Sequence, residues 1–185
     1  DLCDYQAVAK TLASTKPDTV INLAAFRNLE ACEEDINSAF AVNSHAVRNL
    51  AQICNQAQIR LVHFSTDYVF GGDQNTPYRE DSPLNPLNVY GVSKASGEYF
   101  IRHICREHLI IRTSGIFGTK GTNFVETMLR LGEKNGHVSV VTDQVLSPTS
   151  TRDLIPAIKE LIDLRAQGVY HITNSGSCSW YEFAE

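Results

Sequence analysis

Short apolar runs, each followed by small or polar residues, most constrain how this chain can fold. Residues 19–25 are apolar at odd and even positions alike, as in a strand that is buried on both faces of a parallel sheet. Residues 59–64 and 109–113 have the same apolar character. Helical patterns separate these runs, so strands alternate with helices. This order predicts an α/β fold with a parallel sheet and right-handed connections.

The segments between these strands have the signals of helices and turns. Asp4 is suited to cap a helix over residues 4–15, and Asn88, preceded by Pro86, is suited to start another. We expect helices at 4–15, 33–57, 89–107, 124–133 and 151–166, further strands at 138–141 and 169–172, a loop at 67–87 and a helix that starts at Ser179. Pro156 lies inside the last long helix, where proline removes a hydrogen bond.

Two of the predicted strands end in residues that suit a binding site. Ala24 and Ala25 end the first apolar run, and Ser65, Thr66 and Asp67 follow the second. Open parallel sheets bind ligands beyond the carboxyl ends of their strands, and small side chains let a ligand approach the backbone. The sequence therefore predicts a binding site where these two strands end.

Tyr90 and Lys94 are four residues apart in the helix predicted at 89–107. That spacing puts both side chains on one helix face, with their Cβ atoms roughly 5–6 Å apart. A free tyrosine has a pKa of about 10, and a nearby ammonium lowers that pKa. With a Thr66 hydroxyl to hold a carbonyl oxygen, the set suits hydride chemistry: Lys94 tunes, Tyr90 transfers the proton and Thr66 orients. The same spacing also occurs between surface side chains that have no catalytic role.

Longer stretches around these residues resemble the extended short-chain dehydrogenase/reductases, and among them the dTDP-4-dehydrorhamnose reductase family. The stretches are 65–70 (STDYVF), 77–80 (PYRE), 86–94 (PLNVYGVSK) and the pair Gly97-Glu98. The resemblance extends from Asp1 to Trp180. It implies a Rossmann-like doubly wound parallel sheet, incomplete at its N-terminal side, with part of a small C-terminal substrate-binding region. The implied boundaries are a dinucleotide-binding domain at 1–120 and a substrate-binding region at 121–185.

The resemblance also assigns roles to individual residues. It implies NADPH or NADH as the cofactor, with a cofactor-binding set of Ala24, Ala25, Asn43, Ser65, Tyr90 and Lys94. It implies a nucleotide-sugar substrate, with a substrate-binding set of Asp67, Tyr68, Lys120, Asn123 and Phe124. Thr66, Tyr90 and Lys94 form the catalytic set, and no metal is expected.

Two of these assignments have structural alternatives. Asn43 interrupts the apolar stripe of the helix predicted at 33–57, and a buried amide needs hydrogen-bond partners. The backbone of a neighbouring strand can supply them, whereas the resemblance puts Asn43 in the framework near the catalytic lysine. The N-terminus of the 124–133 helix, beside Lys120, suits a diphosphate, but Thr122 or Asn123 equally suits a simple helix cap.

The reaction that the resemblance implies is NAD(P)H-dependent reduction of a 4-keto deoxysugar nucleotide, from dTDP-4-dehydro-L-rhamnose to dTDP-L-rhamnose. One alternative is a nucleotide-sugar epimerase or dehydratase of the same superfamily, but dehydratases need an acid where this chain has Tyr68. Another is a non-catalytic subunit that resembles the regulatory β subunit of methionine adenosyltransferase. Gly115 stands where many of these reductases have tryptophan, so the sugar is less constrained than the reaction.

Composition limits the binding partners and the cellular location that fit this chain. A net charge of −5 and a pI near 5.7 argue against nucleic acid and anionic membranes as partners. The five cysteines are scattered without a C-x-x-C pair, so neither a disulfide framework nor a zinc site is expected, and the cytoplasm fits best. His63 and His171 each lie in an apolar run and are expected to be core or edge residues.

A glycine-rich turn is missing from the sequence. A nicotinamide enzyme of this fold needs one after its first strand, and no Gly-x-x-Gly-x-x-Gly occurs in the 185 residues. Members of the family begin with two further βα units. We therefore expect an internal fragment of a longer protein that does not turn over alone. Its exposed strand edge suits pairing with a second copy, as in a homodimer.

Overall fold

The computed structural model describes residues 1–185 and divides the chain into two compact units. The first comprises Asp1–Arg112 and Gln167–His171, and the second comprises Thr113–Ala166 and Ile172–Glu185. The sequence-based boundary was at residue 120. In the structure the first unit ends earlier, at Arg112, and also includes the later segment Gln167–His171. That the two parts bind a dinucleotide and a substrate stays a prediction.

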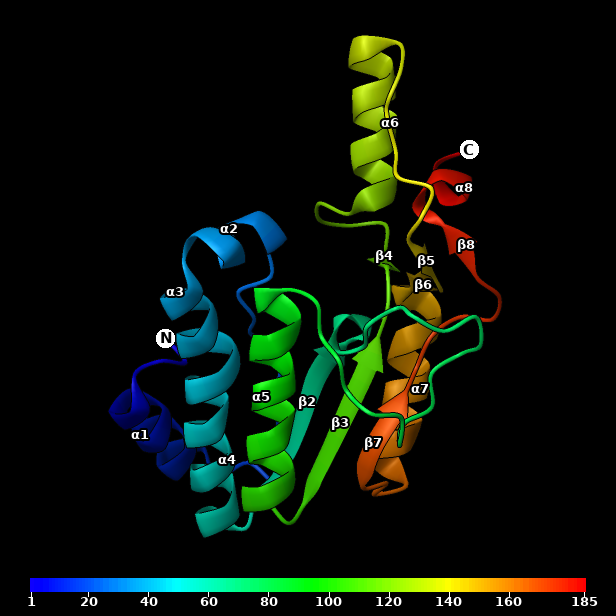
Figure 1. Cartoon of the computed structure of the whole chain (residues 1–185). Helices are drawn as coiled ribbons and strands as arrows, with labels where there is room; N and C mark the ends of the chain where they lie inside the picture. The colour runs from blue at the N-terminus through cyan, green and yellow to red at the C-terminus, as the bar shows by residue number, and fades with distance from the viewer. The chain divides into compact units, whose positions relative to one another are not determined.

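The first unit is built on a four-stranded sheet with helices (Figure 1). Its elements are α1 (Tyr5–Thr15), β1 (Thr19–Asn22), α2 (Leu29–Glu34), α3 (Ile36–Phe40), a π-helical turn (Ala41–His45), α4 (Ala46–Ala57), β2 (Arg60–Thr66), a 3-10 turn (Asp67–Val69), α5 (Val89–Ile104), β3 (His108–Thr113) and β7 (Gly168–His171). The strands lie in the order β1-β2-β3-β7, with β1 parallel to β2 and β3 parallel to β7. The predicted α/β fold with a parallel sheet is confirmed.

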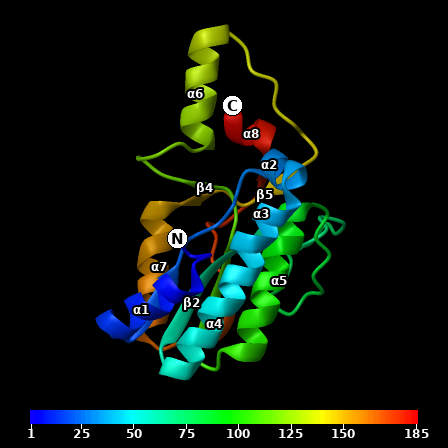
Figure 2. The same ribbon diagram turned by 90° about the vertical axis from the view of Figure 1, so that its left-hand side faces the viewer.

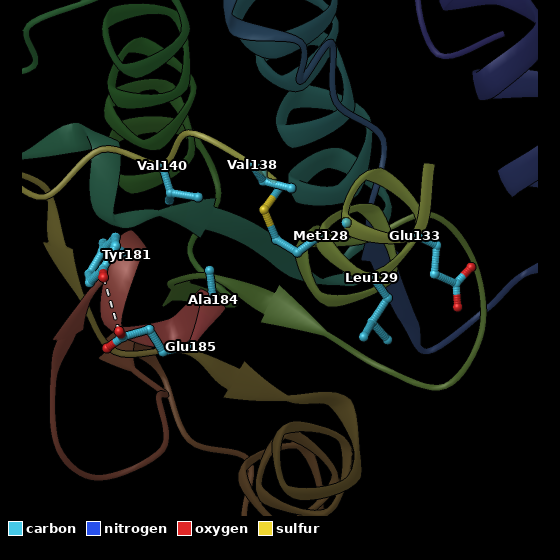
Figure 3. Close-up of a pocket in the computed structure, with 9 residues that line it drawn as sticks. Met128, Leu129, Glu133, Val138, Val140, Tyr181, Ala184 and Glu185 are labelled. Carbon is cyan, nitrogen blue, oxygen red and sulfur yellow. Dashed lines mark hydrogen bonds between the residues drawn. The ribbon is translucent and has the colours of Figure 1, made fainter. Parts of the chain in front are cut away.

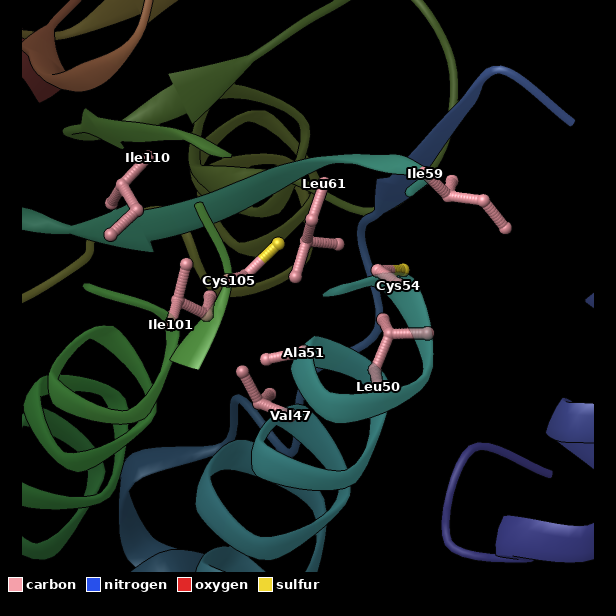
Figure 4. Close-up of a cluster of buried hydrophobic side chains, with 9 residues drawn as sticks. All are labelled: Val47, Leu50, Ala51, Cys54, Ile59, Leu61, Ile101, Cys105 and Ile110. Carbon is pink, nitrogen blue, oxygen red and sulfur yellow. The ribbon is translucent and has the colours of Figure 1, made fainter. Parts of the chain in front are cut away.

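The core of this unit lies between the sheet and helices α4 and α5 (Figure 4). Its buried residues come from both layers: Leu61 and Ile110 from the strands, Val47, Leu50, Ala51 and Cys54 from α4, Ile101 from α5, and Ile59 and Cys105 from adjoining turns. Burial of each large aliphatic side chain stabilises the fold by about 1.5–3 kcal/mol. Helix α1 packs against α4 and extends this core (Figure 2). Because His63 is two residues after Leu61 in β2, it points from the same face of the sheet, toward α5.

Strand β1 is shorter and more exposed than the sequence predicts. It ends at Asn22, whose Oδ1 accepts a hydrogen bond from Ala24 N at 3.1 Å and so turns the chain out of the sheet. Val20 packs against the core, so Ile21 points to the opposite face of the sheet and is 49% exposed, and Leu23 just beyond the strand is 68% exposed. The prediction that this run is buried on both faces is wrong for the 185-residue chain.

The single helix predicted at 33–57 is three helices and a π turn. Helices α2 and α3 meet at Asp35, whose Oδ1 accepts a hydrogen bond from Ser38 N at 3.0 Å and caps α3. The π turn then joins α3 to α4. Asn43 lies in this turn, and π turns frequently occur at functional sites. Periodicity alone did not indicate either interruption.

The second unit contains two short strand pairs and three helices. Its elements are β4 (Ile116–Phe117), α6 (Phe124–Asn135), β5 (Val145–Leu146), β6 (Thr149–Ser150), α7 (Thr151–Asp163), β8 (Cys178–Ser179) and α8 (Trp180–Ala184). Strand β4 is parallel to β6, and β5 is antiparallel to β8. None of the chain's helices combines the length and the apolar character needed to span a bilayer.

Several predicted elements of the second unit differ in detail. The strand predicted at 138–141 does not form, because no neighbouring strand pairs with it; Val141 O instead accepts a hydrogen bond from Tyr181 N at 3.1 Å. Helix α7 continues through Pro156, and α8 starts at Trp180, with the predicted first residue Ser179 as its cap. Helix α7 ends at Asp163 rather than at 166, just as α5 in the first unit ends at Ile104 rather than at 107.

Helix α5 approaches the π turn so closely that glycine is required at the contact. A Cβ atom at Gly97 would lie 2.4 Å from the Asn43 carbonyl oxygen. Protein interiors do not tolerate such an overlap, so a larger residue would push α5 away from the turn. The position of the whole helix, which carries Tyr90 and Lys94, therefore depends on this glycine.

Gly97→Ala should lower the free energy of unfolding by about 1–3 kcal/mol, although alanine has the higher helix propensity. Gly132→Ala is the matched control, because Gly132 lies within α6 and a Cβ atom there meets nothing within 4 Å. The control should be neutral or stabilise by up to about 1 kcal/mol. Urea denaturation followed by circular dichroism measures both, and equal effects at the two glycines would contradict the close contact at Gly97.

Candidate active site

Thr66 and Tyr90 come together at the carboxyl end of β2. Asn88 caps α5 by accepting a hydrogen bond from Gly91 N at 2.8 Å, so Tyr90 lies in the first helical turn. The Thr66 hydroxyl lies beside the Tyr90 phenol, close enough to lower the pKa of the phenol. Thr66 Oγ1 donates to Asp67 Oδ1 at 2.9 Å and accepts from Tyr68 N at 3.3 Å. The structure thus joins two of the three residues predicted to be catalytic.

Burial raises the pKa of Tyr90 to about 12. The Thr66 hydroxyl acts in the opposite direction, whereas the nearby Asp67, Cys32 and Tyr68 raise this pKa further. The lowering that the sequence predicts from Lys94 is not seen, because burial is the largest effect and the lysine nitrogen bonds elsewhere. At neutral pH the phenol therefore keeps its proton and is a donor.

Lys94 is almost completely buried, with only 2% of its surface exposed. Its Nζ donates to the Phe64 carbonyl oxygen at 2.6 Å and lies 3.4 Å from Nε2 of His63. Burial lowers the pKa of Lys94 to about 8, and the Glu98 carboxylate acts in the opposite direction. The charge of this side chain therefore changes just above neutral pH.

Asn43 connects the loop after β1 to helix α5. Its Oδ1 accepts from Phe26 N at 2.8 Å, and its Nδ2 donates to Phe26 O at 2.9 Å and to Ser93 Oγ at 3.0 Å. The amide is thus satisfied by backbone, as the structural alternative predicts, although the partner belongs to a loop rather than a strand. Because Ser93 adjoins Lys94, the amide also lies in the framework of the lysine.

The carboxyl ends of β1 and β2 have features that fit a bound dinucleotide. Ser65 is 6% exposed, and its Oγ is buried with no hydrogen-bond partner in the structure. A buried hydroxyl without a partner costs free energy, so a polar group of a ligand would satisfy it. Ala24 is exposed and Ala25 is half-buried, which leaves their backbone open to approach. The assignment of these residues to the cofactor stays a prediction.

Tyr68 packs against Tyr90 in the same unit. The ring centroids are 5.8 Å apart and the rings are nearly perpendicular, at 74°. Burial, followed by the charge of Asp67, raises the pKa of Tyr68. A Cβ atom at Gly91 would lie 2.1 Å from the Tyr68 carbonyl oxygen, so glycine at that position permits the contact. Asp67 and Tyr68, both predicted to bind substrate, therefore lie beside the predicted proton donor.

Asn123, in the second unit, is the cap of α6. Its Oδ1 accepts from Glu126 N at 3.2 Å, and its Nδ2 donates to Gly118 O at 2.9 Å and Gly121 O at 3.0 Å. The alternative that Asn123 is a helix cap therefore describes its contacts in this structure. Its role in substrate binding stays a prediction.

Lys120 and Phe124 also belong to the second unit. Lys120 is exposed, and the Phe124 ring packs against Trp180, with a centroid separation of 4.4 Å. Gly115 has a φ of +51°, and a Cβ there would lie 2.6 Å from Leu146 Cδ1. A tryptophan at position 115 would therefore need a different local backbone. The substrate roles of Lys120 and Phe124 stay predictions.

Glu98 and Arg112 form a buried ion pair that sequence reasoning missed. Arg112 Nη2 lies 2.7 Å from Glu98 Oε2, and the two side chains are 1–2% exposed. Arg112 Nη1 donates to Glu80 O at 3.2 Å and lies 3.3 Å from His171 Nε2. Glu80 Oε1 in turn accepts from His171 N at 3.1 Å. The pair fixes α5 to β3, and a charged residue within the apolar 109–113 run was the signal that could have identified it.

An apolar pocket in the second unit lacks groups for the predicted chemistry (Figure 3). Its volume is about 460 Å³, and it lies between α6, residues 138–140 and α8. Its lining is Met128, Leu129, Gly132, Glu133, Val138, Val140, Tyr181, Ala184 and Glu185. Its one hydroxyl, on Tyr181, already donates to Glu185 Oε1 at 2.9 Å. The reactive side chains instead gather at the end of β2 in the first unit.

The parallel sheet, with a tyrosine–lysine helix at the end of its strands, defines a Rossmann-like α/β protein. A family model described as the RmlD substrate binding domain matches residues 1–185, and the chain belongs to this family. Over 184 residues it is 44% identical to the spore coat polysaccharide biosynthesis protein SpsK of Bacillus subtilis, and over 189 residues it is 35% identical to the dTDP-4-dehydrorhamnose reductase of Escherichia coli.

A solved structure has the same fold over the whole chain. It is the dTDP-4-dehydrorhamnose reductase of Bacillus anthracis in complex with NADP, with 39% identity and a TM-score of 0.96. All of this chain is covered in each of the three comparisons, but only 65% of the Bacillus subtilis protein, 63% of the Escherichia coli protein and 66% of the crystallised chain. The chain therefore spans just under two thirds of these relatives.

Glu98→Leu should lower the free energy of unfolding by about 3–5 kcal/mol, because it leaves the Arg112 guanidinium buried without its carboxylate. The double variant Glu98→Leu/Arg112→Met removes both charges and should be more stable than the single variant. Lys159→Met is the control: it breaks an exposed pair with Asp163 in α7, where the side chains are 74% and 59% exposed, and should cost less than about 1 kcal/mol. A double variant less stable than Glu98→Leu in urea denaturation would show that charge burial is not the dominant cost.

The stability of the wild-type chain should rise with pH relative to Lys94→Met. An unfolded lysine has a pKa of about 10.4, whereas that of Lys94 is lowered to about 8 in the folded state. Between these values the unfolded state binds more protons, so raising the pH favours folding, by about 3 kcal/mol in all. Urea denaturation of both proteins from pH 7 to pH 10.5 measures the difference, and a constant difference would contradict the lowered pKa.

Proposed function

We propose that a protein containing this chain reduces the 4-keto group of a deoxysugar nucleotide with NADPH or NADH, converting dTDP-4-dehydro-L-rhamnose to dTDP-L-rhamnose. The observation that carries the proposal is the placement of the Tyr90 phenol beside the Thr66 hydroxyl, with Lys94 buried on the same helix as the phenol. The names of the Escherichia coli and Bacillus anthracis relatives support the substrate, and the NADP complex of the latter supports the cofactor.

Each residue of the catalytic set has a distinct part. A nicotinamide, when bound, supplies a hydride for C4 of the sugar. Tyr90 donates its phenolic proton to the carbonyl oxygen, which becomes the C4 hydroxyl. Thr66 turns its hydroxyl hydrogen from Asp67 to the same oxygen and so positions it against the phenol. With cofactor bound, Lys94 contacts the ribose as an ammonium, and in that complex its charge lowers the pKa of Tyr90, an effect that is absent from the chain alone.

The binding residues follow from the same arrangement. Ser65 offers its buried hydroxyl to the cofactor, and Ala24 and Ala25 offer open backbone, while Asn43 fixes the adjoining loop. Asp67 and Tyr68 contact the sugar beside the phenol. Lys120, Asn123 and Phe124 are also assigned to the substrate-binding set.

Reduction is favoured over dehydration by the position of Tyr68. A dehydratase needs an additional acid beside the tyrosine to eliminate water, and in this chain a tyrosine ring packs there, 5.8 Å from the Tyr90 ring. The raised pKa of Tyr68 keeps this second phenol protonated and neutral. The residue therefore shapes the site without supplying a carboxyl group.

The proposal also covers the cellular location, the oligomeric state and the activity of the 185-residue chain. Five cysteines without a disulfide support a cytoplasmic location. The exposed Ile21 at the β1 edge supports a homodimer of the 185-residue chain. The chain spans 65% of the Bacillus subtilis relative, so we also propose that the 185 residues alone do not turn over.

Tyr90→Phe in the full-length protein should reduce turnover by about 10²–10⁴-fold, because it removes the proton donor while keeping the ring. Tyr99→Phe is the matched control, since Tyr99 is on the same helix but 59% exposed, and should keep wild-type turnover. Oxidation of NADPH and of NADH, followed at saturating dTDP-4-dehydro-6-deoxy-L-mannose, measures both variants beside the 185-residue chain.

The outcomes separate the alternatives. Retained turnover in Tyr90→Phe would refute the assignment of the proton donor. No oxidation by the wild-type protein with this sugar, but oxidation with another 4-keto sugar nucleotide, would keep the reaction and change the substrate. No oxidation with any of them, together with co-purification of a partner enzyme, would favour a binding subunit instead.

A further inference from the structure

Three buried polar side chains form a row near the proposed active site, one each from β1, β2 and α5. Nδ2 of Asn22 lies 3.0 Å from Nδ1 of His63, and Nε2 of the same ring lies 3.4 Å from Nζ of Lys94. Asn22 is 4% exposed, His63 is 0% exposed and Lys94 is 2% exposed. The proposed reaction gives no part to Asn22 or His63. Because these side chains are buried, each hydrogen-bond donor in the row needs an acceptor and each acceptor needs a donor.

The orientation of Asn22 determines which ring nitrogen of His63 carries the proton. Asn22 Oδ1 accepts from Ala24 N at 3.1 Å, so the amide NH₂ group faces the histidine. Because that group is a donor, His63 Nδ1 accepts and the ring proton is on Nε2. The ring therefore presents an N–H group to Lys94.

That N–H group distinguishes between the two forms of Lys94. An ammonium has three donors and no lone pair, so it cannot accept from His63 Nε2. A neutral amine accepts there and still donates to the Phe64 carbonyl oxygen, which lies 2.6 Å from Nζ. Burial and the neighbouring lysine hold the pKa of His63 well below its usual range, so the ring stays neutral. The arrangement favours the amine.

We propose that His63 is a positioning residue that sets the fraction of Lys94 present as ammonium, with Asn22 fixing the tautomer of the ring. The inference rests on the proposed function, in which the charge of Lys94 tunes Tyr90. Glu98, on the same helix, favours the ammonium and so opposes His63. The other titratable groups near the site, Asp67 and Tyr68 after β2 and Cys32 on α2, act on Tyr90 rather than on Lys94.

The consequence for the reaction is a limit at alkaline pH. In the proposed cofactor-bound enzyme the Lys94 ammonium lowers the pKa of Tyr90, so kcat falls as rising pH removes the lysine proton. Without the N–H group of His63, the ammonium persists to higher pH. His63→Phe should therefore move the alkaline limb of the kcat profile upward by about one pH unit or more, which loss of packing alone would not do.

The direct test is the titration of Lys94 by NMR in the 185-residue chain with labelled lysine side chains. The Lys94 signal is assigned by its loss in Lys94→Met. His63→Phe should raise the Lys94 pKa by about one unit or more. His108→Phe is the control, because His108 Nδ1 bonds to Cys105 O at 2.7 Å, away from Lys94, and it should change nothing. An unchanged Lys94 pKa in His63→Phe would overturn the proposal.

A second variant keeps the test decisive if the first does not fold. Asn22→Asp has nearly the same shape but replaces the donor with an acceptor, so the ring proton moves to Nδ1 and a lone pair faces Lys94. The ¹⁵N shifts of His63 should report an Nε2–H tautomer in the wild type and an Nδ1–H ring in this variant, with a raised Lys94 pKa. A wild-type ring protonated on Nδ1 would refute the inference.

The two proposals fail separately. A shift of the Lys94 pKa in the variants, with no reduction of any 4-keto sugar nucleotide by the full-length protein, would refute the proposed function and leave the control of Lys94 by His63 supported. Active full-length enzyme with the same Lys94 pKa and the same kcat profile in wild type and His63→Phe would refute only the role of His63.

Discussion

The buried ion pair between Glu98 and Arg112 is the interaction on which the arrangement of the first unit depends. Two opposite charges at 2.7 Å, almost out of contact with water, hold α5 against β3. Charges buried in this way are tolerated only when each is fully paired, so the pair permits little movement of the helix. The remaining guanidinium nitrogen reaches Glu80 O and His171, which extends the constraint to the loop after β2 and to β7.

The geometry of the proposed active site depends on helix α5. Tyr90 lies in the first turn of α5, and Lys94 lies one turn before the ion pair, so fixing Glu98 also fixes the phenol and the lysine. On the neighbouring face, Gly97 allows the π turn to come close and brings Asn43 to Ser93. Strand β2 supplies the opposing groups, Thr66 at its end and His63 in its middle. One helix and one strand thus position nearly every polar group of the site.

Local patterns in the sequence predicted the parts of this arrangement that depend on local chemistry. The four-residue spacing of Tyr90 and Lys94, the cap at Asn88 and the strand that leads to Thr66 are each encoded within a few residues. The π turn around Asn43, the failure of 138–141 to form a strand and the raised pKa of Tyr90 depend on residues distant in sequence. Pattern and propensity carry no information about such neighbours, so these features appeared only in three dimensions.

Asn43 connects the loop after β1 to helix α5 through hydrogen bonds to both segments. Its amide holds Phe26 by both backbone groups and holds Ser93 at the same time. A ligand that contacts the backbone near Ala25 therefore lies next to Phe26, which is held by the same amide that bonds Ser93, the residue before Lys94. In this fold one buried amide thus joins the loop at the end of the first strand to the helix that carries both Tyr90 and Lys94.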